Sequence, residues 1–272
     1  MKSILSLFVI LLIVSTCFSC SNSDDILLEP QAKPVVTKSS MDVETFTKTI
    51  VYKGKVYNSI CESRNDSIFY QNKKIESLLN EIYSNPTSVS FVQNEEVTVY
   101  FDSQEEFLQN YDIILLPEDS LVEMRSIRTK ASPNGPQYNS FAYTILYDDT
   151  KFRDTYYELD ITDTDHTYSV TNMKDHALND KVSSLKVQYT YYGEDYDKQC
   201  ALLTVWEDSD FNKGDNNKTK HRTNFVATSN NRYLEVSSLK KVSCWNAHDS
   251  WNDRISSLVF HLGVIGNLPE VY

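Results

Sequence analysis

The same seven-residue pattern occurs twice in this 272-residue chain, at residues 179–185 and again at residues 252–258. Each copy has two side chains that carry oxygen, two other residues, two serines and the start of a β-rich run. By chance the pattern should occur in roughly one chain of this size in thirty, and twice far less often. A single Asn-Asp or Ser-Ser pair is ordinary turn chemistry, but two copies favour an architecture built from a repeated unit.

The repeated pattern has the chemistry of a hard-cation site. Calcium takes about six to eight oxygen ligands from carboxylates, amides, hydroxyls, backbone carbonyls and water. A turn that enters a strand can direct several of these oxygens toward one point, so two such turns predict two calcium sites. The candidate side chains are Asn179, Asp180, Ser183, Asn252, Asp253 and Ser256.

A second repeated pattern lies upstream of each copy of the first. Residues 144–152 and 203–211 each contain a β-rich run, an aromatic residue, two acidic residues, two others and a phenylalanine. The aromatic pairs are Tyr147 with Phe152 and Trp206 with Phe211. This spacing predicts two hairpins in which the paired rings pack over a polar tip.

Together the two repeats resemble the βγ-crystallin domain, which is built from two Greek-key motifs. In that family each motif has an aromatic-x4-Phe-x-Gly hairpin, and calcium-binding members have an Asn/Asp-Asn/Asp-x-x-Ser/Thr-Ser loop. Both loops match here, but Asp154 and Lys213 replace the hairpin glycines. That leaves the hairpin geometry open, because glycine there supplies a positive φ. The resemblance covers about residues 140–263 and implies an all-β Greek-key sandwich over residues 139–265.

The resemblance also implies how each calcium ion is held. In the family, Asp and Ser side chains of the loops are joined by backbone carbonyls that follow the hairpin aromatic residue. The corresponding carbonyls here are those of Asp148 and Glu207. The sequence does not settle which serine completes which site. About one carboxylate per site implies weak binding, with a dissociation constant of roughly 10⁻⁵ to 10⁻³ M.

The second motif is longer than the first. The hairpin aromatics are 59 residues apart and the loop asparagines 73, so 14 extra residues lie between hairpin and loop in the second motif. We place them in residues 212–223 and 240–250. Cys200 opens this motif and Cys244 lies in the second segment. In an oxidising compartment the two could form a disulfide, with two free thiols as the alternative.

The first twenty residues resemble a bacterial lipoprotein signal peptide with its lipobox. Lys2 precedes an apolar run at residues 4–14 and a short stretch of small residues. In that class the mature chain begins with a diacylated cysteine. Cys17 has the better upstream context, whereas Cys20 is followed by polar and acidic residues that resemble a surface-export signal. We prefer Cys20 and expect a surface-exposed outer-membrane lipoprotein, with an unlipidated secreted protein as the alternative.

The segment between the lipobox and the repeats has a mixed pattern. Residues 21–40 are polar, contain proline and predict a flexible tether. Residues 41–117 predict a small α+β domain, with a hairpin around Gly54, a helix through residues 75–82, a strand at residues 97–101 and a capping box opening a short helix at Ser103. Residues 118–138 contain prolines and a glycine and predict a linker.

Composition narrows the functional classes. The chain has 26 basic and 38 acidic residues, a net charge of −12, which disfavours binding to nucleic acid and to anionic membrane surfaces. Residues 41–117 lack histidine, and Cys61 has no nearby base, so we recognise no catalytic constellation. We expect a non-enzymatic calcium-binding lipoprotein, attached through its lipid, whose extracellular protein or glycan partner the sequence does not identify. The alternatives are a proteinase inhibitor, with the insertion before Asn252 as its reactive loop, and a hydrolase of extracellular polymers.

Overall fold

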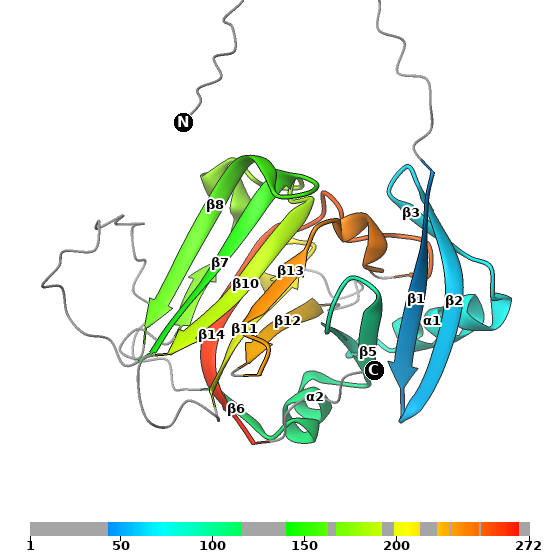
Figure 1. The fold of residues 1–272 in the computed structure, drawn as a ribbon, viewed down its shortest axis with the longest axis horizontal. Coiled ribbons are helices and arrows are strands. Elements are labelled where there is room, and N and C mark those ends of the chain that lie inside the picture. The colour runs from blue at the N-terminus through cyan, green and yellow to red at the C-terminus, as the bar shows by residue number, and fades with distance from the viewer. Residues whose placement is uncertain are drawn as a thin grey trace, which may run out of the picture. The chain divides into compact units, whose positions relative to one another are not determined.

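The computed structural model describes residues 43–115, 140–162, 167–191, 199–212, 222–228, 230–244 and 246–266. The predicted signal peptide, Cys17, Cys20, the tether at 21–40 and the linker at 118–138 lie outside these ranges. Residues Met41–Tyr272 form one compact unit, and its fold is mostly β (Figure 1). None of the described helices is long and apolar enough to cross a membrane.

The N-terminal part contains six strands and two helices. They are β1 (Glu44–Tyr52), β2 (Lys55–Arg64), β3 (Ser67–Tyr70), α1 (Lys73–Ser84), β4 (Val89–Val92), β5 (Val97–Phe101), α2 (Gln104–Asn110) and β6 (Ile113–Leu115). The predicted hairpin is confirmed: β1 and β2 pair across a turn in which Gly54 has a φ of +70°. The predicted helix is α1, and Ser103 caps α2 by accepting a hydrogen bond from Glu106 N.

The described residues of the C-terminal part form eight strands, which fall into two successive groups of four. The first group is β7 (Ser140–Asp149), β8 (Arg153–Thr162), β9 (Thr167–Val170) and β10 (Ser184–Tyr191), with the short 3-10 helix η1 (Met173–His176) before β10. The second group is β11 (Gln199–Trp206), β12 (Arg222–Thr228), β13 (Tyr233–Val236) and β14 (Ser257–Ile265), with η3 (Ser209–Asn212) after β11 and η4 (Leu239–Lys241) after β13.

The third strand of each group pairs with the other group. The smaller sheet has the order β13-β10-β7-β8, so β13 joins the strands of the first group. In return, β9 pairs with β14 of the second group. The two groups therefore cannot separate without breaking backbone hydrogen bonds in both sheets.

The larger sheet continues into the N-terminal part. Its ten strands include the path β3-β2-β1-β5-β4-β12-β11-β14-β6, in which β4 pairs parallel to β12 and β6 pairs antiparallel to β14. The predicted division into a 41–117 domain and a 139–265 domain is therefore not seen in the packing. Strands from both sides of the predicted linker share one sheet.

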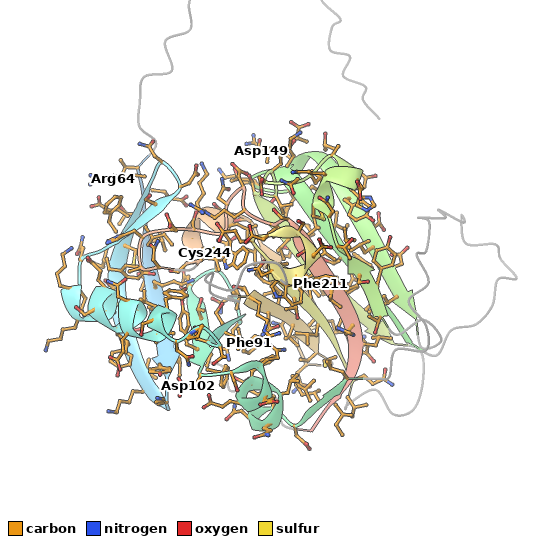
Figure 2. The ribbon with its side chains drawn as sticks, turned by 180° about the vertical axis from the view of Figure 1, so that it is seen from behind. Arg64, Phe91, Asp102, Asp149, Phe211 and Cys244 are labelled. Atoms are coloured by element: carbon orange, nitrogen blue, oxygen red, sulfur yellow. The ribbon has the colours of Figure 1, made fainter. Side chains whose placement is uncertain are left out.

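Both faces of the larger sheet are covered where the two parts meet. On β11, Leu203 and Val205 pack into the largest apolar cluster, which also contains Leu146 and Leu185 of the smaller sheet. The alternate residue Leu202 packs on the opposite face in a second cluster with Phe91 of β4 and Phe107 of α2 (Phe91 is labelled in Figure 2). A third cluster lies between α1 and β1–β3.

The disulfide considered for Cys200 and Cys244 is not formed. Neither cysteine forms a disulfide, and both side chains are buried. Cys200 belongs to the cluster with Phe91 and Phe107, whereas Cys244 belongs to the cluster between the sheets. Alternation along β11 gives the reason, because it directs Cys200 to the face of the sheet away from the other thiol.

Candidate metal centre

The two hairpins fold alike at their tips. The rings of Tyr147 and Phe152 lie 5.7 Å apart at an interplanar angle of 62°, and those of Trp206 and Phe211 lie 5.2 Å apart at 64°. The prediction that the paired rings pack together is confirmed. Asp154 has a φ of 68°, so an aspartate supplies the positive φ for which the family pattern has glycine. Lys213 lies outside the described residues.

The second serine of each loop locks a hairpin tip in place. Ser184 Oγ donates to Asp149 O at 2.6 Å and accepts from Phe152 N at 3.1 Å. Ser257 Oγ makes the equivalent bonds to Asp208 O at 2.6 Å and from Phe211 N at 3.2 Å. Asp149 and Phe211, one from each hairpin, are labelled in Figure 2. This role explains why the repeated pattern contains two adjacent serines, since the second holds the hairpin tip by hydrogen bonds.

The two loops lie against each other. Asp180 N donates to Ile255 O at 3.3 Å, and Asp253 N donates to Val182 O at 3.0 Å. Asp180 and Asp253 both adopt left-handed backbone, with φ of 52° and 55°. Aspartate and asparagine tolerate this conformation better than other non-glycine residues, which explains their place in the pattern.

The loops exchange side-chain contacts in a crossed manner. Ser183 Oγ of the first loop donates to Asp253 Oδ1 of the second at 2.8 Å, and Ser256 Oγ of the second donates to Asp180 Oδ1 of the first at 2.8 Å. Both serines are buried, while both aspartates reach solvent. The structure thus brings a carboxylate and a hydroxyl from opposite loops together at two places.

The hairpins bring the remaining candidate residues to the same places. Ser183 N donates to Tyr147 O at 2.9 Å and Ser256 N donates to Trp206 O at 3.0 Å. Asp148 and Glu207 directly follow these two aromatic residues. We call Asp148, Ser183 and Asp253 the Asp253 cluster, and Asp180, Glu207 and Ser256 the Asp180 cluster.

The two asparagines of the pattern support the aspartates beside them. Asn179 Nδ2 donates to Asp180 Oδ2, and Asn252 Nδ2 donates to Asp253 Oδ2 at 2.8 Å. The two positions differ in burial, because Asn252 is only 4% exposed whereas Asn179 is partly exposed. Asn252 Oδ1 is buried and has no hydrogen-bond partner among the described residues.

The electrostatic surroundings of the two clusters also differ. Partial burial raises the pKa of Asp253, and the carboxylates of Asp66 and Asp148 act in the same direction. The hydrogen bond from Ser183 and the ammonium of Lys240 oppose that rise. In the Asp180 cluster, Arg254 Nη1 lies 2.7 Å from Glu207 Oε1, so a cation of the protein already neutralises that carboxylate.

The donor set suits a hard cation. Each cluster offers oxygens of a carboxylate, a hydroxyl and nearby backbone, and the unsatisfied Asn252 Oδ1 adds a buried oxygen beside the Asp253 cluster. Across the described residues, no group of three or more His, Cys, Asp or Glu side chains could hold a metal ion. The oxygens of these clusters fit calcium better than zinc, which prefers nitrogen and sulfur ligands.

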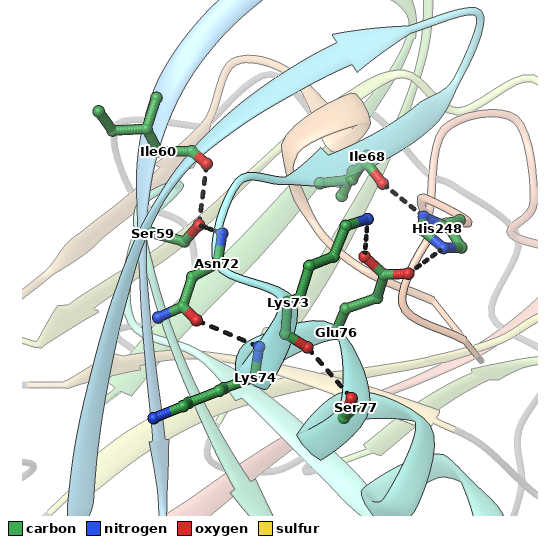
Figure 3. Close-up of polar contacts among 9 residues, drawn as sticks. All are labelled: Ser59, Ile60, Ile68, Asn72, Lys73, Lys74, Glu76, Ser77 and His248. Atoms are coloured by element: carbon green, nitrogen blue, oxygen red, sulfur yellow. Dashed lines mark hydrogen bonds and ion pairs between the residues drawn. The ribbon is translucent and has the colours of Figure 1, made fainter.

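The insertion before Asn252 packs onto the N-terminal part. His248 Nε2 lies 3.1 Å from Glu76 Oε1 of α1, and its Nδ1 lies 3.0 Å from Ile68 O (Figure 3). In addition, Ile68 N donates to His248 O at 2.7 Å. Ser243 and Ala247 are buried, and Ser243 Oγ lies 2.6 Å from Tyr70 OH. This part of the insertion is therefore held against β3 and α1, unlike an exposed reactive loop.

Asp66 is the neighbour of the clusters that sequence reasoning missed. It lies in the turn between β2 and β3, where Asn65 and Asp66 have φ of 47° and 63°. Its Oδ1 accepts a hydrogen bond from Asn252 Nδ2 at 3.1 Å and lies 3.2 Å from Lys240 Nζ. The pair Asn65-Asp66 signals a tight turn, but nothing local indicates that this turn meets the second loop.

Comparisons with known proteins give little further information. No known protein family matches the sequence, and no curated protein is similar to it. Among solved structures, a beta gamma crystallin from Ciona intestinalis is similar over 43% of this chain and 95% of its own chain, with 20% identity and a TM-score of 0.24.

Proposed function

We propose that this chain is a calcium-binding protein whose C-terminal strands form a pair of Greek-key motifs of the βγ-crystallin kind. The observation that carries the proposal is the crossed pairing of Asp253 with Ser183 and of Asp180 with Ser256, because it joins the two copies of the pattern at two equivalent places. The exchange of β9 and β13 between the sheets supports the same motif arrangement. Bound calcium would neutralise the aspartates and tie the two loops together.

We further propose a non-enzymatic role outside the cytoplasm for the lipid-anchored chain. The support is the sequence of residues 1–25, with Cys20 preferred to Cys17 as the lipidated residue. The calcium-stabilised domain would then display a face to an extracellular protein or glycan. Mass spectrometry of the mature N-terminus tests the anchor, since a plain secreted protein would carry no lipid.

Calcium titration of the full chain tests the metal proposal. A cation that binds only the folded state stabilises it by about 2.7 kcal/mol at a concentration one hundred times its dissociation constant, which corresponds to a rise in Tm of roughly 5–10 °C for a protein of this size. We expect two weak sites by isothermal titration calorimetry, and a rise of this size for each occupied site by differential scanning calorimetry.

Asp180→Asn and Asp253→Asn are the matched variants for this test. Asparagine keeps the left-handed backbone that both positions adopt, so each substitution removes a charge with little backbone strain. Each single variant should lose one site, and the double variant should lose the shift in Tm. Asp112→Asn is the control, because Asp112 also has a positive φ, 49°, but precedes β6 at the other end of β14. Failure of calcium to raise the Tm of the unmodified chain would reject the proposal.

A further inference from the structure

The two clusters are equivalent in their repeated residues but not in what surrounds them. Near the Asp253 cluster lie Asp66, from the β2–β3 turn, and Lys240, from η4. The Asp180 cluster has the ion pair of Arg254 with Glu207 instead. One cluster has therefore gained a carboxylate from outside the repeat, and the other has one of its carboxylates neutralised.

The position of Asp66 is fixed by contacts of the two residues that follow it. Ser67 forms a β-bridge with Asp249, and the backbone of Ile68 bonds to His248 (Figure 3). The insertion before the second loop thus holds the β2–β3 turn next to the loop that begins at Asn252. Asp66 is consequently held beside Asn252 by the backbone and does not depend on a mobile side chain reaching across.

Asn252 is the second sign of a ligand at this place. Its amide lies between Asp66 and Asp253 and donates to both carboxylates, at 3.1 Å and 2.8 Å. The side chain is 4% exposed, yet its oxygen has no partner within the described part of the chain. A buried amide oxygen without a donor costs free energy. A cation bound beside the two carboxylates would be a partner for this oxygen.

We infer that Asp66 supplies an additional carboxylate, from outside the repeated pattern, to the Asp253 cluster, and that a divalent cation bound there displaces Lys240 from Asp66. This inference rests on the proposed function. An added carboxylate strengthens calcium binding, and Arg254 neutralises Glu207 in the other cluster, so the Asp253 cluster is the tighter site and the Asp180 cluster the weaker. It also makes the N-terminal hairpin part of the calcium site, so calcium at this cluster stabilises the attachment of β2 and β3.

Calorimetric titration with calcium in the Asp180→Asn background isolates the Asp253 cluster in the full chain. In that background Asp66→Asn should weaken binding by roughly 3- to 10-fold, as expected for the loss of one partly screened charge, whereas Lys240→Gln should tighten it by a similar factor. Asp112→Asn again serves as the matched control, since it removes one acidic charge at a positive φ. It should leave the dissociation constant unchanged.

The outcomes separate this inference from the proposed function. If the unmodified chain binds no calcium, the proposed function fails and this inference with it. If it binds calcium but Asp66→Asn behaves like Asp112→Asn, only the inference is overturned. If Asp66→Asn fails to give a cooperative melt, Lys240→Gln decides, and unchanged or weaker binding in that variant overturns the inference.

Discussion

Lys48 shows how one residue can make the stability of this protein depend on pH. It is fully buried in β1, and its Nζ donates to Glu95 O at 2.9 Å. Burial lowers the pKa of Lys48 to about 7, against an opposing influence of nearby Cys61 and glutamates. In the unfolded chain the pKa of a lysine is about 10.4. Between these values the unfolded chain binds a proton that the folded protein does not, so stability rises with pH there.

We expect Lys48→Met to remove this rise. The free energy of unfolding of the unmodified protein should increase between pH 7 and pH 9, by at most about 1.4 kcal/mol per pH unit from this residue. Urea unfolding at the two pH values measures the difference. The variant Lys55→Met, at an exposed position in β2, is the control and should keep the rise. Equal pH dependence in Lys48→Met and in the unmodified protein would contradict the assignment.

The residues of the repeated pattern are where sequence reasoning was most informative. The left-handed aspartates and hairpin-locking serines act through their immediate neighbours, so the sequence indicates their roles. The crossed Asp–Ser pairing could not be derived in the same way, because its partners are 70 and 76 residues apart. The same limit applies to Asp66, which meets Asn252 across 186 residues.

At the scale of elements, α1 depends on the cap at its first turn. Asn72 Oδ1 accepts a hydrogen bond from Lys74 N at 3.1 Å, which satisfies one of the free N–H groups at the helix start. The helix in turn buries Ile75, Leu79 and Ile82, at the spacing that predicted it. The cap therefore supports the cluster between α1 and β1–β3.

Asn72→Ala should destabilise the protein by about 1 kcal/mol, because it removes the N-cap acceptor. For a protein of this size that loss lowers the Tm by roughly 2–4 °C, measurable by circular dichroism. Asn72→Asp keeps an acceptor at the cap and should stay close to the unmodified protein. A similar loss in both variants would show that the amide nitrogen of Asn72, and not its oxygen, matters.

The sequence of β11 contains a signal that was not used in predicting the domain boundary. Residues 200–206 read Cys-Ala-Leu-Leu-Thr-Val-Trp, and every one of them is buried. A strand with one face in water alternates apolar and polar residues, whereas a near-continuous apolar run is typical of a strand covered on both faces. The run thus fits β11 packing on α2 and β4 as well as on the smaller sheet. Which segment covers the second face depends on the parallel pairing of β4 with β12, which no local pattern indicates.

At the scale of the whole molecule, the shared sheet joins the N-terminal and C-terminal parts. Besides the backbone pairing of β4 with β12, Ser90 Oγ lies 2.7 Å from Thr223 Oγ1 and Asn224 Nδ2 donates to Gln104 at 3.0 Å. The first contact joins two neighbouring strands of the larger sheet, and the second joins that sheet to α2. Separating the two parts would expose the apolar cluster around Phe91 and Phe107 to water.

Thermal unfolding should therefore show one cooperative transition for both parts of the chain. Differential scanning calorimetry measures this, and the calorimetric enthalpy should equal the van't Hoff enthalpy. Two separate domains joined by a linker would instead give two transitions. If calcium moved only the upper of two transitions, the parts would unfold independently, contrary to the shared sheet.

The crossed contacts of the two loops have a consequence for how this protein can change. Each loop gives its aspartate to one cluster and its serine to the other. Deleting one copy of the pattern would thus disrupt both clusters, whereas substituting Asp253 and Ser183 together would disrupt only the Asp253 cluster. Each cluster is therefore made of the aspartate of one loop and the serine of the other. One cluster can change by substitutions in both loops while the other cluster is kept, although the repeated unit of the sequence is a single loop.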